Sequence, residues 1–497
     1  MADQPLAVID VGSNSGRMIV VRCPTGEHLD VLVEQRVPLR LARDVAANGS
    51  IGEKALARAI GALHDFRDLA QAHGAARMIA VATAAVREAS NGKEFLERVG
   101  RETGIDVEVI DGAREATLSF RGAVHSLPVE DGMLLDVGGG SLELSAFSKR
   151  KLVRSWTLPL GALMVSERFL SGDPPERGER RRLIDHVVES LSDDAVARLG
   201  ADGELVGTGG TVRNLAKMDR RERNYAVPRL HGYLLPLSHV DELTHLLASR
   251  PIEKRALLSG LSADRADSIV GGSIVVRTVM EFIGARELIV SGKGLREGAA
   301  LEALTDGIPS ASSARASSVR SFASRMSSWE PDRADRRAAL AADLLSALVS
   351  PVEQELAEML GHACVVLDLG ATIDPYNRHE HAAAAVLAGD LSGFSHPQLV
   401  VVAAILRRAD KQDAGLKPFK SLLRSYDPVG LTRAATVLAV ADEVDRRLLP
   451  GATVIVGGSR KTLTIEAPLR PGRWIDALSE RTRIVFGRSL ALQEATS

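Results

Sequence analysis

The sequence has few cysteines and no long apolar run. Its 497 residues include only Cys23 and Cys364, so a disulfide framework is not expected. No apolar run approaches the roughly 18 residues that span a membrane. The first residues, Met1-Ala2-Asp3-Gln4-Pro5, lack the charged segment and long apolar core of a signal peptide. We therefore expect a soluble, cytoplasmic protein without a membrane partner.

A large excess of charge of one sign is also absent. The formal net charge is −2 at pH 7, so the chain as a whole does not favour a nucleic-acid partner. Hydrophobic residues make up 45% and charged residues 25% of the chain, which is typical of a globular protein with an ample core. At this length we expect two to four domains.

Strand and helix patterns alternate over the first three hundred residues. The segments that begin at residues 6 and 133 both start with an apolar strand, a Gly/Ser turn and a second apolar strand, which indicates an internal repeat of architecture. After an irregular stretch at 307–316 the chain is mostly helical, and it ends in a β-hairpin and a helix. The expected strands are 6–11, 17–22, 30–37, 78–83, 106–110, 133–137, 142–147, 151–158, 204–207, 287–291, 452–456 and 462–466, and helical spacing covers 53–73, 179–199 and 473–485.

Two short runs at strand ends nearly repeat each other, Asp10-Val-Gly-Ser-Asn-Ser15 and Asp136-Val-Gly-Gly-Gly-Ser141. Glycine lets backbone N–H groups approach a ligand closely, and Ser and Asn add short donors. Two such loops facing each other would form a cleft for phosphate groups and a divalent metal. Asp136 and Glu143 flank the second turn, where both could reach one Mg²⁺; a plain hairpin is the alternative.

Two further glycine loops follow apolar strands, at 207–211 and 291–298. The first precedes a helix-like segment, an arrangement that favours anion binding. Between the twin loops lie Arg87 and Glu115. From spacing alone, Arg87 is either a phosphate ligand or a surface residue. Glu115 is either a catalytic base or an ordinary acidic residue in the first turn of a helix.

Together these motifs resemble the exopolyphosphatase/guanosine pentaphosphate phosphatase (Ppx/GppA) family of the actin-like ATPase superfamily. The resemblance spans residues 6–300, and the motifs stand in the order of the family. The matching runs are Ile9-Asp-Val-Gly-Ser-Asn-Ser15, Ala82-Thr-Ala-Ala-Val-Arg87, Gly112-Ala-Arg-Glu-Ala-Thr-Leu118, Leu135-Asp-Val-Gly-Gly-Gly-Ser-Leu-Glu143, Leu158-Pro-Leu-Gly161, Gly207-Thr-Gly-Gly-Thr-Val-Arg-Asn-Leu215 and Gly294-Leu-Arg-Glu-Gly298.

The resemblance implies an α/β fold of two ribonuclease-H-like lobes with the active site in the cleft between them. It implies that Glu115 is the catalytic base and that Asp136 and Glu143 are ligands of Mg²⁺ or Mn²⁺. One departure is Gly16-Arg17, where the family usually has an aromatic-His pair. The implied phosphate-binding residues are Asp10, Gly12, Ser13, Asn14, Ser15, Arg87, Gly138, Gly139, Gly140, Ser141, Gly209, Gly210 and Thr211.

Residues 319–445 resemble the helical HD-like domain of the family, but the His-Asp pair of an HD hydrolase is incomplete, and His379 and His381 are at most remnants of its metal site. Leu367-Asp368 replaces the His-Asp pair, and leucine cannot ligate a metal. We therefore expect an all-α domain with a degenerate metal site, which serves dimerisation or extends the substrate-binding surface. The expected divisions are lobes 1–125 and 126–306, the helical domain 307–448 and a small α+β segment 449–497.

The sequence therefore favours an exopolyphosphatase, a homodimer that hydrolyses the terminal phosphoanhydride of inorganic polyphosphate and releases orthophosphate. Aromatic residues make up 3% of the chain, and no aromatic cluster suited to stacking on guanine is apparent. Two alternatives within the enzyme class are a hydrolase that converts guanosine pentaphosphate to the tetraphosphate and a kinase of the same superfamily. A third alternative is a non-catalytic sensor that binds guanosine tetraphosphate.

Overall fold

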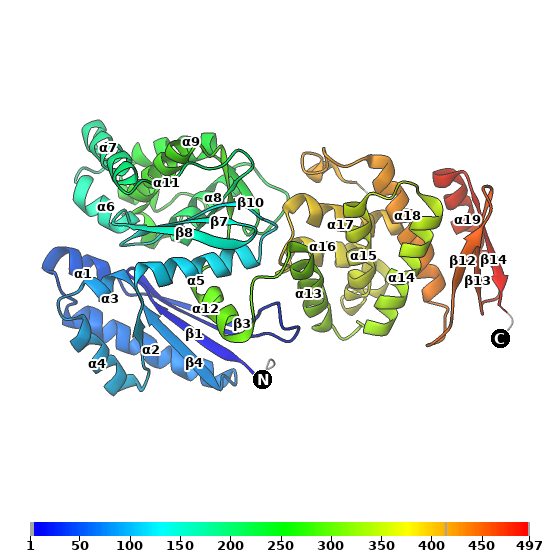
Figure 1. The fold of residues 1–497 in the computed structure, drawn as a ribbon, viewed down its shortest axis with the longest axis horizontal. Coiled ribbons are helices and arrows are strands. Elements are labelled where there is room, and N and C mark those ends of the chain that lie inside the picture. The colour runs from blue at the N-terminus through cyan, green and yellow to red at the C-terminus, as the bar shows by residue number, and fades with distance from the viewer. Residues whose placement is uncertain (1–3, 413–414, 496–497) are drawn as a thin grey trace. The chain divides into compact units, whose positions relative to one another are not determined.

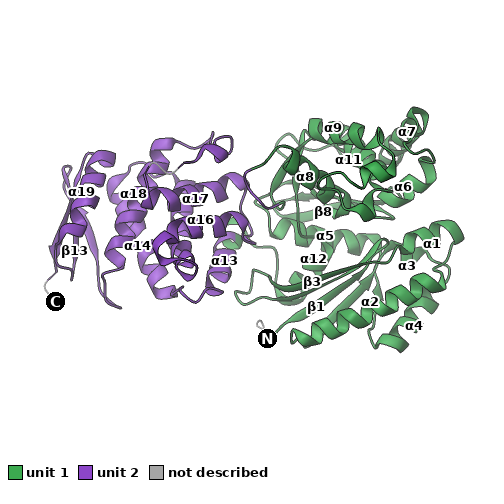
Figure 2. Ribbon diagram, turned by 180° about the vertical axis from the view of Figure 1, so that it is seen from behind, with its two compact units in different colours: residues 1–225, 230–314 green, residues 226–229, 315–497 purple. Residues whose placement is uncertain are grey.

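The computed structural model describes residues 4–412 and 415–495, and the chain divides into two compact units (Figures 1 and 2). The first unit comprises residues 1–225 and 230–314, and the second comprises 226–229 and 315–497. The finer division into lobes at residue 126 and into a terminal segment at residue 449 stays a prediction. No helix in the described part of the chain is long and apolar enough to cross a membrane.

Two mixed sheets form the framework of the first unit. The first contains β1 (Leu6–Val11), β2 (Ser15–Arg22), β3 (Asp30–Pro38), β4 (Arg77–Ala82) and β5 (Glu108–Val109). The second contains β6 (Gly132–Val137), β7 (Leu142–Ser148), β8 (Lys151–Leu158), β9 (Glu204–Thr208), β10 (Tyr233–Pro236) and β11 (Glu287–Val290).

Both sheets follow the same plan. Their orders are β3-β2-β1-β4-β5 and β8-β7-β6-β9-β11-β10. In each sheet the first strand of the repeat is antiparallel to the next strand in the chain and parallel to a later one. The α/β fold class and the internal repeat are therefore confirmed.

Helices cover both faces of these sheets (Figure 1). On the first sheet, Phe66 of α2 and Phe95 of α4 pack against Ile9 and Met18 in one apolar cluster. The helices of this unit are α1 (Leu41–Asn48), α2 (Glu53–Ala72), α3 (Ala84–Glu88), α4 (Gly92–Thr103), α5 (Gly112–His125), α6 (Ala162–Phe169), α7 (Arg177–Asp193), α8 (Gly209–Glu222), α9 (Leu237–Ala248), α10 (Ile252–Arg255), α11 (Ile269–Ile283) and α12 (Leu295–Leu304), with a 3₁₀ turn at Ala263–Arg265.

Helices α5 and α12 each pack against the sheet that they do not directly follow in the chain, so the two helices are exchanged between the sheets. Phe120 of α5, which follows the first sheet in the chain, packs against Phe147 of the second sheet with ring centroids 5.5 Å apart. Ala300 of α12, which follows the second sheet, packs in the cluster that contains Val8 of the first sheet. This exchange joins the two halves of the first unit.

The exchanged helices cross in direct backbone contact. A Cβ atom at Gly298 would lie 1.8 Å from the carbonyl oxygen of Leu118, and one at Gly122 would lie 2.1 Å from the carbonyl oxygen of Gly294. No side chain fits at either position, so glycine is required for this approach. The crossing fixes the position of Glu115, at the start of α5, relative to the loop that precedes α12.

The second unit is a helical bundle with a small terminal sheet of order β12-β13-β14. Its helices are α13 (Ala311–Ser324), which begins just before the unit boundary, α14 (Pro331–Leu348), α15 (Gln354–Val366), α16 (Arg378–Ala388), α17 (His396–Asp410), α18 (Pro428–Asp445) and α19 (Arg473–Phe486). Short 3₁₀ segments are Leu367–Thr372, Pro375–Asn377 and Lys417–Phe419, and the strands are β12 (Ile455–Gly458), β13 (Thr462–Ala467) and β14 (Ser489–Glu494).

Two local expectations for this part of the chain were wrong. Helix α13 begins at Ala311, inside the stretch expected to be irregular, because the backbone continues to bond helically from Ser310. Strand β12 begins at Ile455 rather than residue 452. Gly458 belongs to this strand, and the turn is closed by Ser459, whose N–H donates to the carbonyl of Thr462 at 2.8 Å.

A buried ion-pair network lies in the core of the second unit. Arg337 is fully buried and donates to Asp368 Oδ2 at 2.8 Å and to Asp442 Oδ1 at 3.1 Å. Arg378 donates to the remaining oxygens of Asp368 and Asp442. Burial opposes ionisation of Asp368, but Arg337, Arg333 and Arg378 hold its pKa below the usual value. Two guanidinium groups thus neutralise the two buried carboxylates.

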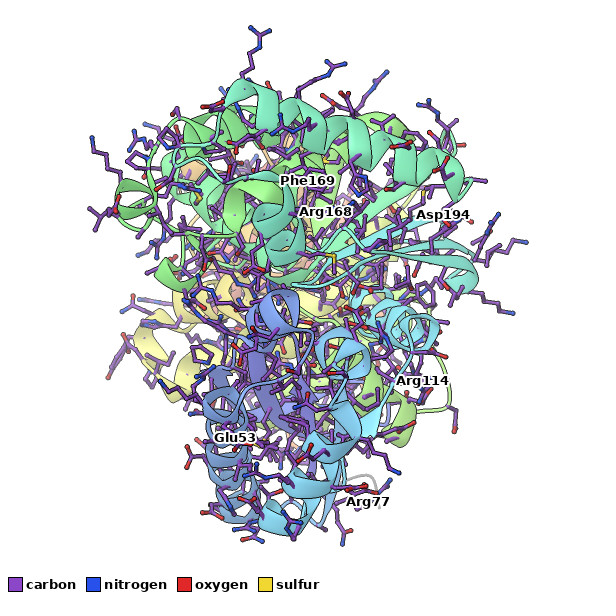
Figure 3. All side chains as sticks on the ribbon, turned by 90° about the vertical axis from the view of Figure 1, so that its left-hand side faces the viewer. Glu53, Arg77, Arg114, Arg168, Phe169 and Asp194 are labelled. Carbon is purple, nitrogen blue, oxygen red and sulfur yellow. The ribbon has the colours of Figure 1, made fainter. Side chains whose placement is uncertain are left out.

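Ionised side chains are exposed on the surface of the first unit. Glu53, Arg77 and Arg114 are exposed on its outer face (Figure 3). Arg114 pairs with Glu302 across α5 and α12. Arg168 lies over the ring of Phe169 at 5.1 Å, so an apolar residue near the surface is covered by a cation.

Candidate active site

The twin loops adopt the same turn. The N–H of Gly12 donates to the carbonyl of Ser15 at 3.2 Å, and the N–H of Gly138 donates to the carbonyl of Ser141 at 3.0 Å. Each turn connects the first strand of its sheet to the antiparallel second strand. The near-repeat in sequence is therefore a repeat in structure.

The two loops face each other in van der Waals contact. A Cβ atom at Gly139 would lie 3.2 Å from Cβ of Ser13, and one at Gly140 would lie 3.3 Å from Oγ of the same serine. The carbonyls of the second loop accept hydrogen bonds from the start of α6, for example from Ala162 to Gly138 at 3.0 Å. These bonds attach the second loop to α6.

The third loop places the N-terminus of α8 beside Asp136. Gly209 has φ of 89°, and a Cβ atom there would lie 2.8 Å from Asp136 Oδ1. The left-handed backbone and the close approach together require glycine at this position. Thr208 Oγ1 donates to the carbonyl of Lys293 at 3.0 Å, which ties this loop to the fourth one.

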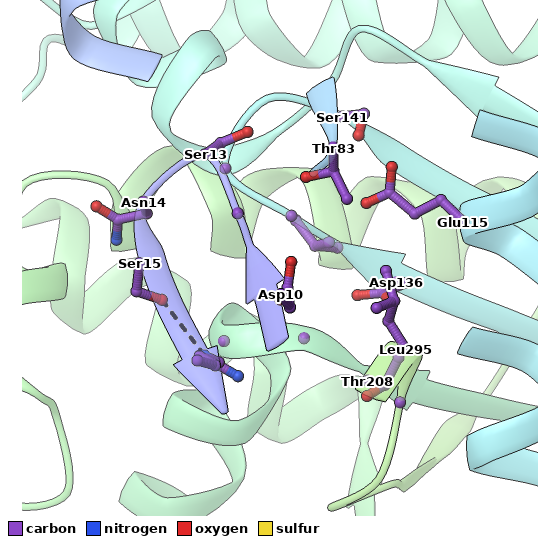
Figure 4. A pocket seen from close by; sticks show the side chains of 18 of the residues that line it. Asp10, Ser13, Asn14, Ser15, Thr83, Glu115, Asp136, Ser141, Thr208 and Leu295 are labelled. Atoms are coloured by element: carbon purple, nitrogen blue, oxygen red, sulfur yellow. Dashed lines mark hydrogen bonds between the residues drawn. The ribbon is translucent and has the colours of Figure 1, made fainter. Parts of the chain in front are cut away.

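All four loops line one cavity of about 110 Å³ (Figure 4). The predicted residues Glu115, Asp136 and Asp10 surround it. Figure 4 shows Asp10 facing Asp136, with Glu115 beside Thr83 and Ser141. The lining residues are Asp10, Gly12, Ser13, Asn14, Ser15, Arg17, Thr83, Glu115, Asp136, Val137, Gly138, Gly139, Gly140, Ser141, Thr208, Gly209, Gly210, Arg213, Arg265, Gly294, Leu295, Arg296 and Glu297.

Three predicted site residues do not line this cavity. Glu143 is buried in β7, directly opposite Asp136 on β6. Arg87 donates to the carbonyl of Ile110 at 2.7 Å, and its Nη1 lies 3.7 Å from Glu115 Oε2, so it faces the glutamate. Thr211 is buried against Gly272.

The carboxyl groups of the site are strongly perturbed. Burial raises the pKa of Asp10 to about 6, although Arg17 and Arg296 oppose this shift. Burial and the neighbouring carboxyls of Asp136 and Asp10 raise the pKa of Glu115 to about 8. Repulsion between nearby negative charges is strong in a buried site, so these groups favour either protons or a bound cation.

The pKa values of Glu143 and Asp136 are raised as well. Burial raises the pKa of Asp136, and burial together with Glu115 and Asp136 raises the pKa of Glu143 well above its usual value. Within the described residues, Asp10 Oδ1, Glu115 Oε2 and Glu143 Oε1 are buried without a hydrogen-bond partner. Such oxygens are suited to receive a cation or its bound water.

Four arginines at the cavity, Arg17, Arg213, Arg265 and Arg296, were not among the predicted site residues. Burial and the cations of Arg213 and Arg296 lower the pKa of Arg17 to about 9, and burial and Arg17 lower that of Arg265 to about 10. Arg213 and Arg296 lie inside two of the motifs that match the family, so the sequence could have indicated that they are at the site. Arg265 lies in a 3₁₀ turn outside every motif, and only the fold brings it to the site.

Residues 19–306 match the model of the Ppx/GppA phosphatase family. The chain belongs to the Ppx/GppA phosphatase family. The matched segment includes three of the four glycine loops completely, and the first loop, at 10–15, lies just before it. The expected family membership is thus confirmed.

Named members of the Ppx/GppA family are similar in sequence. The chain is 32% identical to exopolyphosphatase 1 of Mycobacterium tuberculosis over 303 residues, which cover 60% of this chain and 88% of that protein. It is 33% identical to exopolyphosphatase 2 of the same organism over 319 residues, covering 61% and 99%.

Solved Ppx/GppA structures share the α/β fold. An exopolyphosphatase from Cytophaga hutchinsonii matches with a TM-score of 0.57 and 29% identity, covering 61% of this chain and 98% of that one. The Aquifex aeolicus family member matches with a TM-score of 0.54 and 30% identity, covering 60% and 97%.

Proposed function

We propose that this protein is an exopolyphosphatase that hydrolyses the terminal phosphoanhydride of inorganic polyphosphate and releases orthophosphate. The observation that carries the proposal is a second, strongly cationic cavity that shares walls with the carboxyl-lined one. It has a volume of about 280 Å³. Its cationic lining residues are Arg17, Arg36, Arg213, Lys217, Arg265 and Arg296, against one acidic residue, Glu34.

This arrangement suits a chain of phosphates. Arg17, Arg213, Arg265 and Arg296 line both cavities, so cations continue from the carboxyl groups into the second cavity. Guanidinium groups bind phosphate oxygens with charge-assisted hydrogen bonds. Among the described residues, none that lines either cavity is aromatic. The lining therefore favours a polyanion over a nucleoside that stacks on an aromatic ring.

The residues present fit a divalent cation. No three His, Cys, Asp or Glu side chains within the described ranges are grouped closely enough to hold a metal ion among themselves. Mg²⁺ characteristically uses one or two carboxylates and takes its other ligands from water and substrate phosphate. Asp136 and Glu143 would hold Mg²⁺ or Mn²⁺. When bound, the ion supplies positive charge to the phosphoryl oxygens.

Glu115 is our candidate for the catalytic base. It lies at the first turn of α5 and lines the cavity that the glycine loops surround. In the proposed reaction Glu115 accepts a proton from the attacking water, and loop N–H groups and Arg side chains bind the phosphoryl oxygens. Positioning and charge stabilisation account for most catalysis in phosphoryl transfer. Arg87 lies against Glu115, so we assign it to holding this base in place.

The second unit is proposed to be an HD-like domain with a degenerate metal site. The support is that Arg337 and Arg378 pair with Asp368 and Asp442, where a metal-dependent hydrolase needs its carboxylates for the ion. The ribonuclease-H-like nature of the lobes, a homodimeric state, a cytoplasmic location and binding of guanosine penta- or tetraphosphate stay predictions from the resemblance.

Orthophosphate release from long-chain polyphosphate and from guanosine pentaphosphate, each with and without Mg²⁺, tests the proposal. We expect Mg²⁺-dependent release from polyphosphate without any requirement for ADP. Release from guanosine pentaphosphate alone would establish the nucleotide hydrolase instead. Tight binding of guanosine tetraphosphate with no release from either substrate would establish a sensor.

A further inference from the structure

Ser119 lies where helix α5 meets the strand that carries Asp136. Its side chain is fully buried, and its Oγ donates to Asp136 Oδ2 at 2.8 Å. Ser119 follows Glu115 by one helical turn, so both side chains project from the same face of α5. One helix therefore carries the proposed base and also contacts a proposed metal ligand.

The two oxygens of Asp136 have different surroundings. Oδ2 accepts the hydrogen bond from Ser119, and Oδ1 lies next to Gly209, where a Cβ atom would come within 2.8 Å of it. By contrast, Asp10 and Glu115 each have a buried oxygen without a hydrogen-bond partner in the described residues. Asp136 is thus a carboxylate whose rotation about its side-chain bonds is restrained by a neutral donor.

We infer that Ser119 is a positioning residue whose hydroxyl fixes the oxygen that Asp136 presents to a divalent cation. This inference rests on the proposed function for the identity of the ion. A hydroxyl suits the task because it orients the carboxylate without adding a positive charge that would repel the ion. Hydrogen bonds of this kind to a metal ligand typically change metal affinity or activity by about 10–100-fold.

A purely structural role for Ser119 makes a different prediction. If the hydroxyl only satisfies a buried acceptor, its loss lowers stability and leaves the affinity for a metal unchanged. Ser126, the residue directly after α5, offers a matched control. It is also buried, and its Oγ contacts the backbone carbonyls of Gly122 and Ala123 in α5, with no carboxylate partner among the described residues.

The test compares the wild-type full chain with Ser119→Ala and Ser126→Ala. The affinity for Mn²⁺ without substrate is measured from the electron paramagnetic resonance signal of the free ion, and melting temperatures are recorded for all three proteins. We expect Ser119→Ala to bind Mn²⁺ about 10–100-fold more weakly and Ser126→Ala to bind it as the wild type does. Equal Mn²⁺ affinity for Ser119→Ala and wild type overturns the inference, as does equal weakening by both substitutions.

Failure of the proposed function gives a separate result. If the wild type binds Mn²⁺ but releases no orthophosphate from polyphosphate, the function fails while the affinity of Ser119→Ala still decides the role of the serine. If the wild type hydrolyses polyphosphate and Ser119→Ala binds Mn²⁺ normally, the function stands and the role of Ser119 is refuted. A wild type that binds no Mn²⁺ also refutes that role.

Discussion

At the scale of single residues, the proposed role of Glu115 as the general base can be tested directly. We expect Glu115→Gln to lower kcat for polyphosphate by about 10²–10⁴-fold, because the amide cannot accept the proton of water. Binding of polyphosphate should change little, since the substitution removes no cation. Steady-state phosphate release and equilibrium binding measure the two effects. Glu108→Gln, at an exposed site on β5, is the control, and near-normal turnover in Glu115→Gln would remove it from this role.

The pKa of Asp10 leads to a prediction about stability. Burial raises this pKa from 3.8 to about 6, so the unfolded chain releases the proton first as pH rises. The stability that the protonated carboxyl group of Asp10 contributes is fully present below about pH 4 and is lost as the pH rises through about 6. In the presence of a chelator, the stability of Asp10→Asn relative to wild type should therefore rise by about 2 kcal/mol between pH 4.5 and pH 7.5. Melting temperatures at both pH values measure this gain, and a constant difference would contradict it.

The buried ion pairs of Arg337 lead to a second prediction about stability. Removing one partner of a buried ion pair leaves an uncompensated charge and typically costs about 3–5 kcal/mol. We expect Arg337→Met to lower the free energy of unfolding of the second unit by this amount, as measured by urea denaturation. Arg320→Met is the control, because its pair with Asp335 is exposed and such pairs contribute little. Equal stability of the two variants would show that the network is dispensable.

At the scale of elements, the crossing of α5 and α12 sets the geometry of the site. Gly298→Ala places a methyl group against the carbonyl of Leu118, so the helices must separate. We expect a destabilisation of about 1–3 kcal/mol and a lower kcat, because Glu115 shifts with α5. The control is Gly61→Ala, at an exposed position in the middle of α2 where no atom lies within 4 Å of the added Cβ. That variant should be as stable as wild type or more stable, and a similar loss in both would contradict the prediction.

Elements with strong apolar patterns could be predicted from the sequence, and weakly patterned ones could not. Strands β1, β6 and β9 were expected close to their observed bounds because continuous apolar runs precede their glycine loops. Strand β10 covers only Tyr233–Pro236 and ends in a proline, and β14 carries polar residues, so neither was expected. Both exist because they pair with neighbouring strands that are distant in sequence.

At the scale of the whole molecule, the candidate site also has one part that could be predicted from the sequence and one part that could not. The loops of Asp10 and Asp136 could be recognised because their residues are consecutive and serve one local geometry. The cationic cavity could not, because Arg36, Lys217 and Arg265 come from separate elements that only the tertiary fold assembles. Its existence is also hidden in the net charge of −2, which averages over the whole chain.

This uneven distribution of charge predicts how salt affects the enzyme. Binding of a polyanion to clustered cations releases counterions, so the affinity for polyphosphate should fall steeply as KCl rises from 50 to 200 mM. Lys217→Gln removes one cation from the second cavity and should reduce the slope of log affinity against log salt by about 1. Lys93→Gln, exposed on α4 beside Glu97, should leave the slope unchanged. Because the two substitutions change the net charge equally, identical slopes in both variants would refute the cavity as the polyphosphate-binding site.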